Sequence, residues 1–125
     1  MKKVVEIMPA IQFEEYKIKL NNLLPTLDVV EKALNLDGAS REIEELETAG
    51  ARPDFWNDVE NSQRVQKRLK TLKDKTEKFS RLRAGWDDMM TLCDMAVEEN
   101  DDSLLPELER DFAAFSGALE TIRLS

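Results

Sequence analysis

The sequence contains no histidine and a single cysteine, Cys93. Histidine is the usual general base at neutral pH and a favoured zinc ligand, so its absence removes both roles. One cysteine without histidine can build neither a zinc cluster nor a Cys–His nucleophile pair. It also cannot form an internal disulfide, which favours a reducing, cytoplasmic setting. Cys93 lies among apolar residues at helical spacing and is expected in the core.

Glycine and proline are scarce, at four residues each, and aromatic residues make up only 6% of the chain. No glycine-rich phosphate loop is present, and no acidic segment has the residue order of a calcium-binding loop. The acidic residues from 98 to 102 are expected to form a solvated turn rather than a metal site. We therefore expect a chain that binds no cofactor and no metal and is not an enzyme by itself.

Long apolar runs are absent as well. No window approaches the roughly 20 apolar residues of a membrane span, and residues 1–10 are too weakly apolar for a signal peptide. We expect a soluble protein without a membrane partner. Its 125 residues are enough for one domain with its own core.

Apolar residues at helical spacing are what the sequence does contain. They predict one long amphipathic helix, on the order of 60 Å at 1.5 Å per residue, which is too long for the core of a compact domain of this size. The rest of the chain is therefore expected to cover the apolar side of this helix. The stripe consists of Val65, Leu69, Leu72, Phe79, Leu82, Trp86, Met89, Cys93 and Ala96.

The predicted fold class is all-α, an antiparallel helical bundle or coiled-coil-like hairpin built on the long helix. Residues 1–125 are expected to form a single helical domain, because this length is typical of one domain. The short acidic turn before the last helix makes that helix antiparallel to the long one. Helices are expected over residues 11–35, 38–49, 58–99 and 104–124.

The first two helices carry specific boundary signals. Residues 1–10 are expected to be a loose lead-in, and a heptad seam then runs from Tyr16 to Leu34. Pro25 interrupts this seam and predicts a kink or a break. Asp37 is the expected N-cap of the short helix, and Gly50 its expected C-cap.

The segment between the short and the long helix is predicted to be a structural junction. Proline cannot continue a helix there. Phe55 and Trp56 are too large and apolar to remain exposed together, so both are expected to fill the junction. Asn57 is expected to cap the long helix, with Glu60 completing a capping box. The junction residues are Pro53, Asp54, Phe55, Trp56, Asn57 and Asp58.

Charge is distributed unevenly along the chain. The formal net charge is −8, which argues against DNA or other nucleic acid bound by bulk attraction, yet residues 64–83 carry a local charge of +7. This stretch is either a solvated helix face or a face that contacts phosphates, and structured RNA fits it better than a single strand. The candidate ribosomal RNA contacts are Arg64, Lys67, Arg68, Lys70, Lys73, Lys75 and Lys78.

Several short segments together resemble the N-terminal helical domain of the bacterial peptide chain release factor 2 family. The resemblance covers nearly the whole chain, and the run from Pro53 to Asp58 is its most specific part. In chain order the segments are Leu-Asp-Gly (36–38), Ile-Glu-Glu-Leu-Glu (43–47), Pro-Asp-Phe-Trp-Asn-Asp (53–58), Glu-Asn-Ser-Gln-Arg-Val (60–65), Leu-Lys-Thr-Leu-Lys-Asp-Lys (69–75) and Ala-Val-Glu-Glu-Asn-Asp (96–101).

The resemblance implies a role in translation termination at UGA and UAA stop codons. Family members continue well beyond the point equivalent to Ser125, so an N-terminal fragment of a longer factor is expected. The family's Gly-Gly-Gln loop for peptidyl-tRNA hydrolysis and its Ser-Pro-Phe codon-reading tripeptide are absent from this sequence. The implied role is docking at the stalk base of the large ribosomal subunit, on RNA and protein, with a release-factor GTPase as a further partner.

An alternative function follows from the heptad seams alone. A standalone coiled-coil adaptor or assembly protein would bind a partner helix through exposed apolar seams. The same seams would allow the chain to self-associate.

Overall fold

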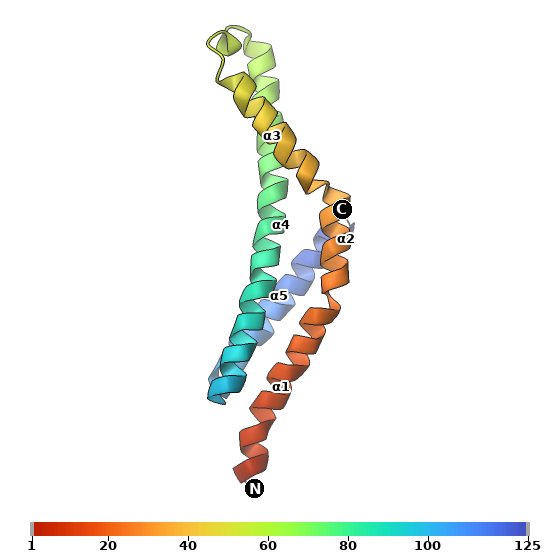
Figure 1. Ribbon diagram of the computed structural model, residues 1–125, viewed down its shortest axis with the longest axis vertical. Helices are drawn as coiled ribbons and strands as arrows, with labels where there is room; N and C mark the ends of the chain where they lie inside the picture. The colour runs from red at the N-terminus through yellow and green to blue at the C-terminus, as the bar shows by residue number, and fades with distance from the viewer. Residues whose placement is uncertain (1, 125) are drawn as a thin grey trace. The chain divides into compact units, whose positions relative to one another are not determined.

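The computed structural model describes residues 2–124, and these residues form an all-α structure without strands (Figure 1). The predicted fold class is therefore confirmed. The elements are α1 (Lys2–Asn22), α2 (Leu24–Leu34), α3 (Leu36–Gly50), the 3-10 turn η1 (Phe55–Asn57), α4 (Val59–Glu99), the 3-10 turn η2 (Asp102–Leu104) and α5 (Leu105–Leu124).

The chain divides into two compact units, with the divisions after Val30 and after Ser80. Unit 1 contains α1, most of α2, the second part of α4 and α5. Unit 2 contains the end of α2, α3, η1 and the first part of α4. The expectation that the chain acts as a single domain stays a prediction, and each unit is described by itself below.

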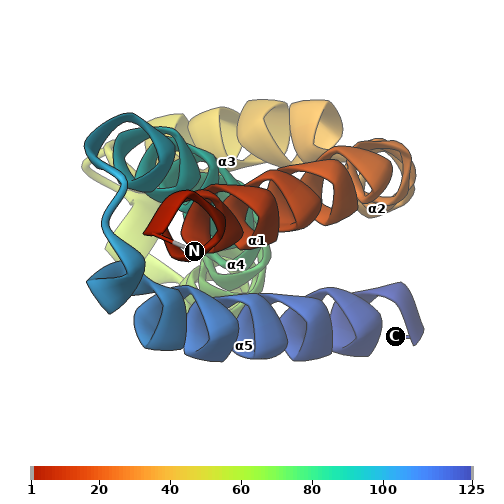
Figure 2. The same cartoon turned by 90° about the horizontal axis from the view of Figure 1, so that it is seen from below.

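Unit 1 is a bundle of α1, α5 and the second part of α4, and α5 runs back along α4 as expected (Figures 1 and 2). The part of the long apolar stripe that lies in this unit is confirmed, because its members here are buried. The buried residues of unit 1 are Phe13, Leu20, Leu27, Val30, Leu82, Trp86, Met89, Cys93, Ala96, Leu108, Phe115 and Leu119. Cys93 is fully buried in this core, as predicted, and burial raises the pKa of its thiol to about 11.

Several side-chain contacts join the helices of unit 1. The indole Nε1 of Trp86 donates a hydrogen bond to the carbonyl oxygen of Leu20, at 2.7 Å in a buried position. Lys17 Nζ lies 2.6 Å from Asp94 Oδ1, which links α1 to α4. The rings of Tyr16 and Phe112 meet edge to face with centroids 5.3 Å apart, and this contact links α1 to α5.

The helical segment predicted over 11–35 is divided in two, because the backbone breaks at Leu23 between α1 and α2. Pro25 lies in the first turn of α2, where a missing N–H is tolerated. The N–H of Leu23 bonds to the carbonyl of Leu20 at 3.1 Å instead of continuing the α-helical pattern. The break that Pro25 predicts is therefore present, two residues before the proline.

The expected loose lead-in over residues 1–10 is also wrong for the described residues. The backbone is helical from Lys2 and passes through Pro9. Proline removes one backbone donor but holds φ at a value that suits a helix. One missing hydrogen bond does not end α1 here.

Both predicted caps of the short helix are displaced. The helix α3 begins at Leu36, and Asn35 rather than Asp37 is its N-cap, with a left-handed φ of 50° and no side-chain capping bond. A Cβ at Gly38 would meet the side-chain amide of Asn35, so a larger residue there would displace that side chain. At the other end α3 includes Gly50 and is followed by Ala51 in a right-handed conformation, so Gly50 is not a left-handed C-cap.

The start of α4 is capped by Asp58 and not by Asn57. Asp58 Oδ1 accepts a hydrogen bond from the N–H of Asn61 at 3.0 Å. The N–H of Asn57 is already bonded to the carbonyl of Asp54 at 3.1 Å, inside η1. Glu60 is consequently the second residue of α4 and not the third, which is the capping-box position.

The end of α4 follows the prediction, since the helix stops at Glu99. Asn100 adopts a left-handed φ of 52°. Its N–H bonds to the carbonyl of Val97 at 3.3 Å, and the N–H of Asp101 bonds to that of Ala96 at 3.1 Å. This pair of bonds is a Schellman motif, and it satisfies carbonyls that the helix end would otherwise leave free.

The substitution Trp86→Phe tests the buried hydrogen bond in unit 1. It removes the indole donor and some buried volume, so we expect the free energy of unfolding to fall by roughly 1–3 kcal/mol. Urea unfolding followed by circular dichroism measures this change. Trp56→Phe is the matched control, because Trp56 is 56% exposed and should change stability by no more than about 0.5 kcal/mol. Equal effects of the two substitutions would contradict the assigned role of Trp86.

The substitution Asp58→Ala tests the observed cap of α4. Loss of an N-cap oxygen costs about 1 kcal/mol, so we expect a loss of that size in the free energy of unfolding. Asn57→Ala is the control and should have a smaller effect, since no side-chain bond of Asn57 occurs among residues 2–124. The reverse order in thermal unfolding would restore Asn57 as the cap.

Candidate functional site

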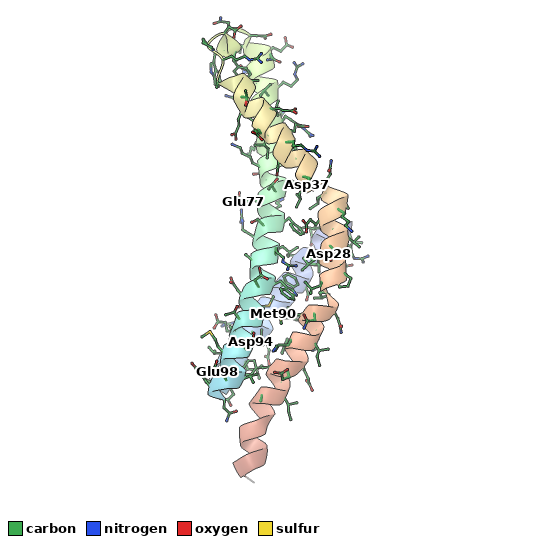
Figure 3. All side chains as sticks on the ribbon, in the orientation of Figure 1. Asp28, Asp37, Glu77, Met90, Asp94 and Glu98 are labelled. Carbon is green, nitrogen blue, oxygen red and sulfur yellow. The ribbon has the colours of Figure 1, made fainter. Side chains whose placement is uncertain are left out.

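The charge of α4 changes sign along the helix. The basic candidates all lie in its first part, in unit 2, whereas Asp94 and Glu98 project from its last turns in unit 1 (Figure 3). An anionic ligand would therefore be attracted to unit 2. The basic side chains there fall into different structural roles.

Two of the candidate cations are used within unit 2 to hold α3 against α4. Arg68 binds Glu42 in bidentate fashion, with Nε to Oε2 at 2.5 Å and Nη2 to Oε1 at 3.1 Å. Lys73 Nζ lies 2.8 Å from Glu47 Oε1. Both cations flank the buried Leu72, at the positions where helix pairs commonly carry interhelical charge pairs.

The Arg68–Glu42 pair shifts the pKa of both side chains. The hydrogen bond from Arg68, and then the attraction of Arg68 and Lys75, hold the pKa of the Glu42 carboxyl below its ordinary value. The hydrogen bond to Glu42 raises the pKa of Arg68 in return. Arg68 is thereby neutralised and is a poor candidate for a phosphate contact.

Arg64 and Lys75 are also partly engaged. Arg64 Nη2 donates to Asn61 Oδ1 at 2.6 Å, one turn earlier in α4. Lys75 is half-buried and contributes to the low pKa of Glu42. Neither side chain is committed to an ion pair among the described residues, but neither projects as freely as the remaining lysines.

Lys67, Lys70 and Lys78 form what we call the lysine face. All three are exposed, and within residues 2–124 none of them forms an ion pair. At about 100° per residue they fall within about 80° of one another and roughly opposite the buried Leu72. Asp74 lies on the same side of the helix and Glu77 lies within about 20° of Lys70, which leaves a net charge of +1 on this side.

The structure thus separates the predicted set of contacts. Lys67, Lys70 and Lys78 stay together on one exposed side, whereas Arg68 and Lys73 are taken up by α3. Sequence reasoning missed Glu42 and Glu47 as the partners. Their position beside the apolar residues of α3 was the available signal, because charges beside an apolar seam often pair across it.

The junction over 53–58 matches the prediction only in part. Phe55 is buried, at 9% exposure, but Trp56 is exposed, so the expectation that both fill the junction is wrong. Their rings meet edge to face with centroids 5.0 Å apart. The short 3-10 turn η1 points adjacent side chains in different directions, so one aromatic ring enters the core and the next faces solvent.

Among residues 2–124, no three side chains of His, Cys, Asp or Glu are arranged so that they could hold a metal ion. None of the helices described in this range combines the length and apolar character that crossing a membrane requires.

The titration of Glu42 tests the pairing that removes Arg68 from the site. We expect Arg68→Met to raise the pKa of Glu42 towards its ordinary value, measured by NMR, with Lys78→Met as a control that leaves it unchanged. Because the folded-state pKa is lowered, the pair stabilises the protein above the ordinary glutamate pKa. That stabilisation is lost as the pH falls through the folded-state value. An unaltered Glu42 titration in the Arg68 variant would contradict the pairing.

Comparison with known proteins identifies the family. The PCRF domain matches residues 39–125. The chain is 34% identical over 105 residues to peptide chain release factor 2 of Saccharopolyspora erythraea, covering 84% of this chain and 29% of that protein. It is 35% identical over 105 residues to release factor 2 of Acidothermus cellulolyticus, with 84% and 28% covered.

A release factor 2 from Clostridium perfringens is 30% identical over 113 residues, covering 90% of this chain and 31% of that protein. The chain thus spans about 30% of the length of the curated relatives it matches. No solved structure matches it. The comparisons give no support to the adaptor alternative. The chain belongs to the PCRF domain family, in agreement with its resemblance to release factor 2.

Proposed function

We propose that this chain is the helical N-terminal domain of a translation termination factor and that it docks the factor on the ribosome. The name shared by the relatives, peptide chain release factor 2, supports the termination role. The observation that carries the docking role is the lysine face of α4. It is a cluster of exposed cations in a chain whose formal net charge is −8.

The physical argument for RNA as the docking partner begins with what the lysines can do. Each ammonium is a compact charge on a flexible stem and binds phosphate without reading sequence. The chain as a whole carries a net negative charge, so RNA is attracted to this face more than to the acidic remainder. Electrostatics therefore orients the domain as well as attracting it, and the favoured ligand is the phosphate backbone of folded RNA.

The same proposal extends to the complete factor. Its chemistry would be peptide release at UGA and UAA codons in the cytoplasm, with the hydrolytic and codon-reading parts lying outside this chain. The expected docking place is the stalk base of the large subunit, and a release-factor GTPase is the expected further partner. In this arrangement the domain contributes position and no reacting group.

A competition assay tests the docking role directly. Excess chain should bind ribosomes and slow peptide release by a complete release factor 2, because both would occupy the same place. A variant with Lys67, Lys70 and Lys78 changed to Gln should compete less well. Absence of both binding and competition would refute the proposal.

The salt dependence of ribosome binding tests the lysine face itself. Changing Lys67, Lys70 and Lys78 to Gln should lower the slope of log K against log salt concentration by about 2 to 3, since each lost phosphate contact contributes about 0.7–0.9. The control changes Lys32, Arg41 and Arg110 to Gln, which removes the same charge from exposed positions elsewhere. Equal slopes for the two triple variants would show that only net charge matters and that the lysine face is a solvated surface.

A further inference from the structure

The exposed tryptophan at the start of α4 has no role in the core or in the lysine face. Trp56 is 56% exposed and Val59 is 61% exposed, and only two residues separate them in the chain. We call these two residues the Trp56 patch. A large indole left in water is costly for a soluble protein and is the side chain most enriched at the centres of protein interfaces.

The Trp56 patch stands on a rigid base within unit 2. The Phe55 ring beneath it is buried and contacts the Trp56 ring edge to face at 5.0 Å. Two backbone hydrogen bonds close the turn, from Phe55 to Arg52 at 3.2 Å and from Asn57 to Asp54 at 3.1 Å. The backbone beneath the indole is thus ordered before any partner binds, which lowers the entropic cost of association.

Trp56 also differs from the other tryptophan in its polar atom. The indole N–H of Trp86 donates to the carbonyl of Leu20, whereas the N–H of Trp56 has no hydrogen-bond partner within residues 2–124. An indole with a free donor and an apolar face suits a pocket that is apolar with one acceptor at its edge.

The charges around the patch favour a protein partner over RNA. Asp54, Asp58 and Glu60 lie within four residues of Trp56, against one exposed cation, Arg52. This acidic rim repels a phosphate backbone and attracts lysine and arginine side chains. Its sign is opposite to that of the lysine face, so the two surfaces select different chemistry.

We propose that Trp56 is the anchor of a second contact, in which the patch enters an apolar pocket of a basic protein on the ribosome. The inference rests on the proposed ribosome docking and assigns two separate contacts to it. The lysine face binds RNA, and the Trp56 patch binds a protein surface rimmed by lysine or arginine. Val59 extends the apolar contact along the first turn of α4.

The first test compares two probes, purified large ribosomal subunits and the RNA extracted from them free of protein. Trp56→Ala should weaken binding to the subunits about tenfold or more, as expected for a central aromatic anchor, and should not change binding to the free RNA. Val29→Ala is the matched control, because Val29 is 64% exposed on α2 and should bind both probes like the unaltered chain. Equal thermal unfolding of the variants excludes a folding defect, and Val59→Ser should weaken subunit binding in the same direction.

The second test uses the negative charge of the acidic rim. Asp54 makes no side-chain capping bond, so Asp54→Lys changes the charge without removing a structural contact. A basic protein partner predicts weaker binding to the subunits, whereas stacking of Trp56 on RNA predicts stronger binding.

The possible results separate the two proposals. If Trp56→Ala binds subunits like the unaltered chain while the lysine variant does not, the inference is wrong and the docking proposal stands. If Trp56→Ala weakens binding to the protein-free RNA, or if Asp54→Lys strengthens binding to the subunits, the partner of the patch is RNA and the inference is wrong. If the unaltered chain binds neither probe, both proposals fail.

Discussion

The hydrogen bond from Trp86 to the carbonyl of Leu20 is the constraint on which unit 1 depends. In an unbroken helix that carbonyl would accept the N–H of Leu24, but the break at Leu23 turns the last residues of α1 into a tighter turn. The carbonyl then accepts both the Leu23 N–H and the indole. A buried polar contact of this kind has one geometry, so it fixes where α1 lies along α4, which apolar packing alone leaves adjustable.

Contacts within the fold also explain why few of the basic residues of α4 remain available for a ligand. A cation next to the buried seam pairs with a carboxylate of the neighbouring helix, as Arg68 does with Glu42. A cation on the opposite side, such as Lys70, has no helix within reach in unit 2 and stays solvated. The local charge of +7 therefore overstates the binding surface, because rotation about the helix axis decides which charges the fold itself neutralises.

Periodicity predicted correctly the structural features that depend on many residues at once. The buried stripe of α4, the end of that helix at Glu99 and the presence of a break near Pro25 all follow from repeated spacing or from a residue with few allowed conformations. The errors lie where neighbouring residues compete for one role. Asp37 and Asn35, or Asn57 and Asp58, are each plausible caps, and only the path of the backbone decides between them. Hydrophobicity likewise could not tell that Phe55 is buried and Trp56 is not.

The exposed Trp56 and the lysine face together explain why a docking domain would combine two unlike surfaces. Contacts to phosphate are strong at low ionic strength and weaken steeply as salt displaces them, whereas an apolar anchor is nearly insensitive to salt. In the proposed docking, charge would attract and orient the domain during approach, and the aromatic contact would slow its departure. Both surfaces lie in unit 2, outside the Trp86 core of unit 1, so binding chemistry can change there without disturbing the hydrogen bond that holds α1 to α4.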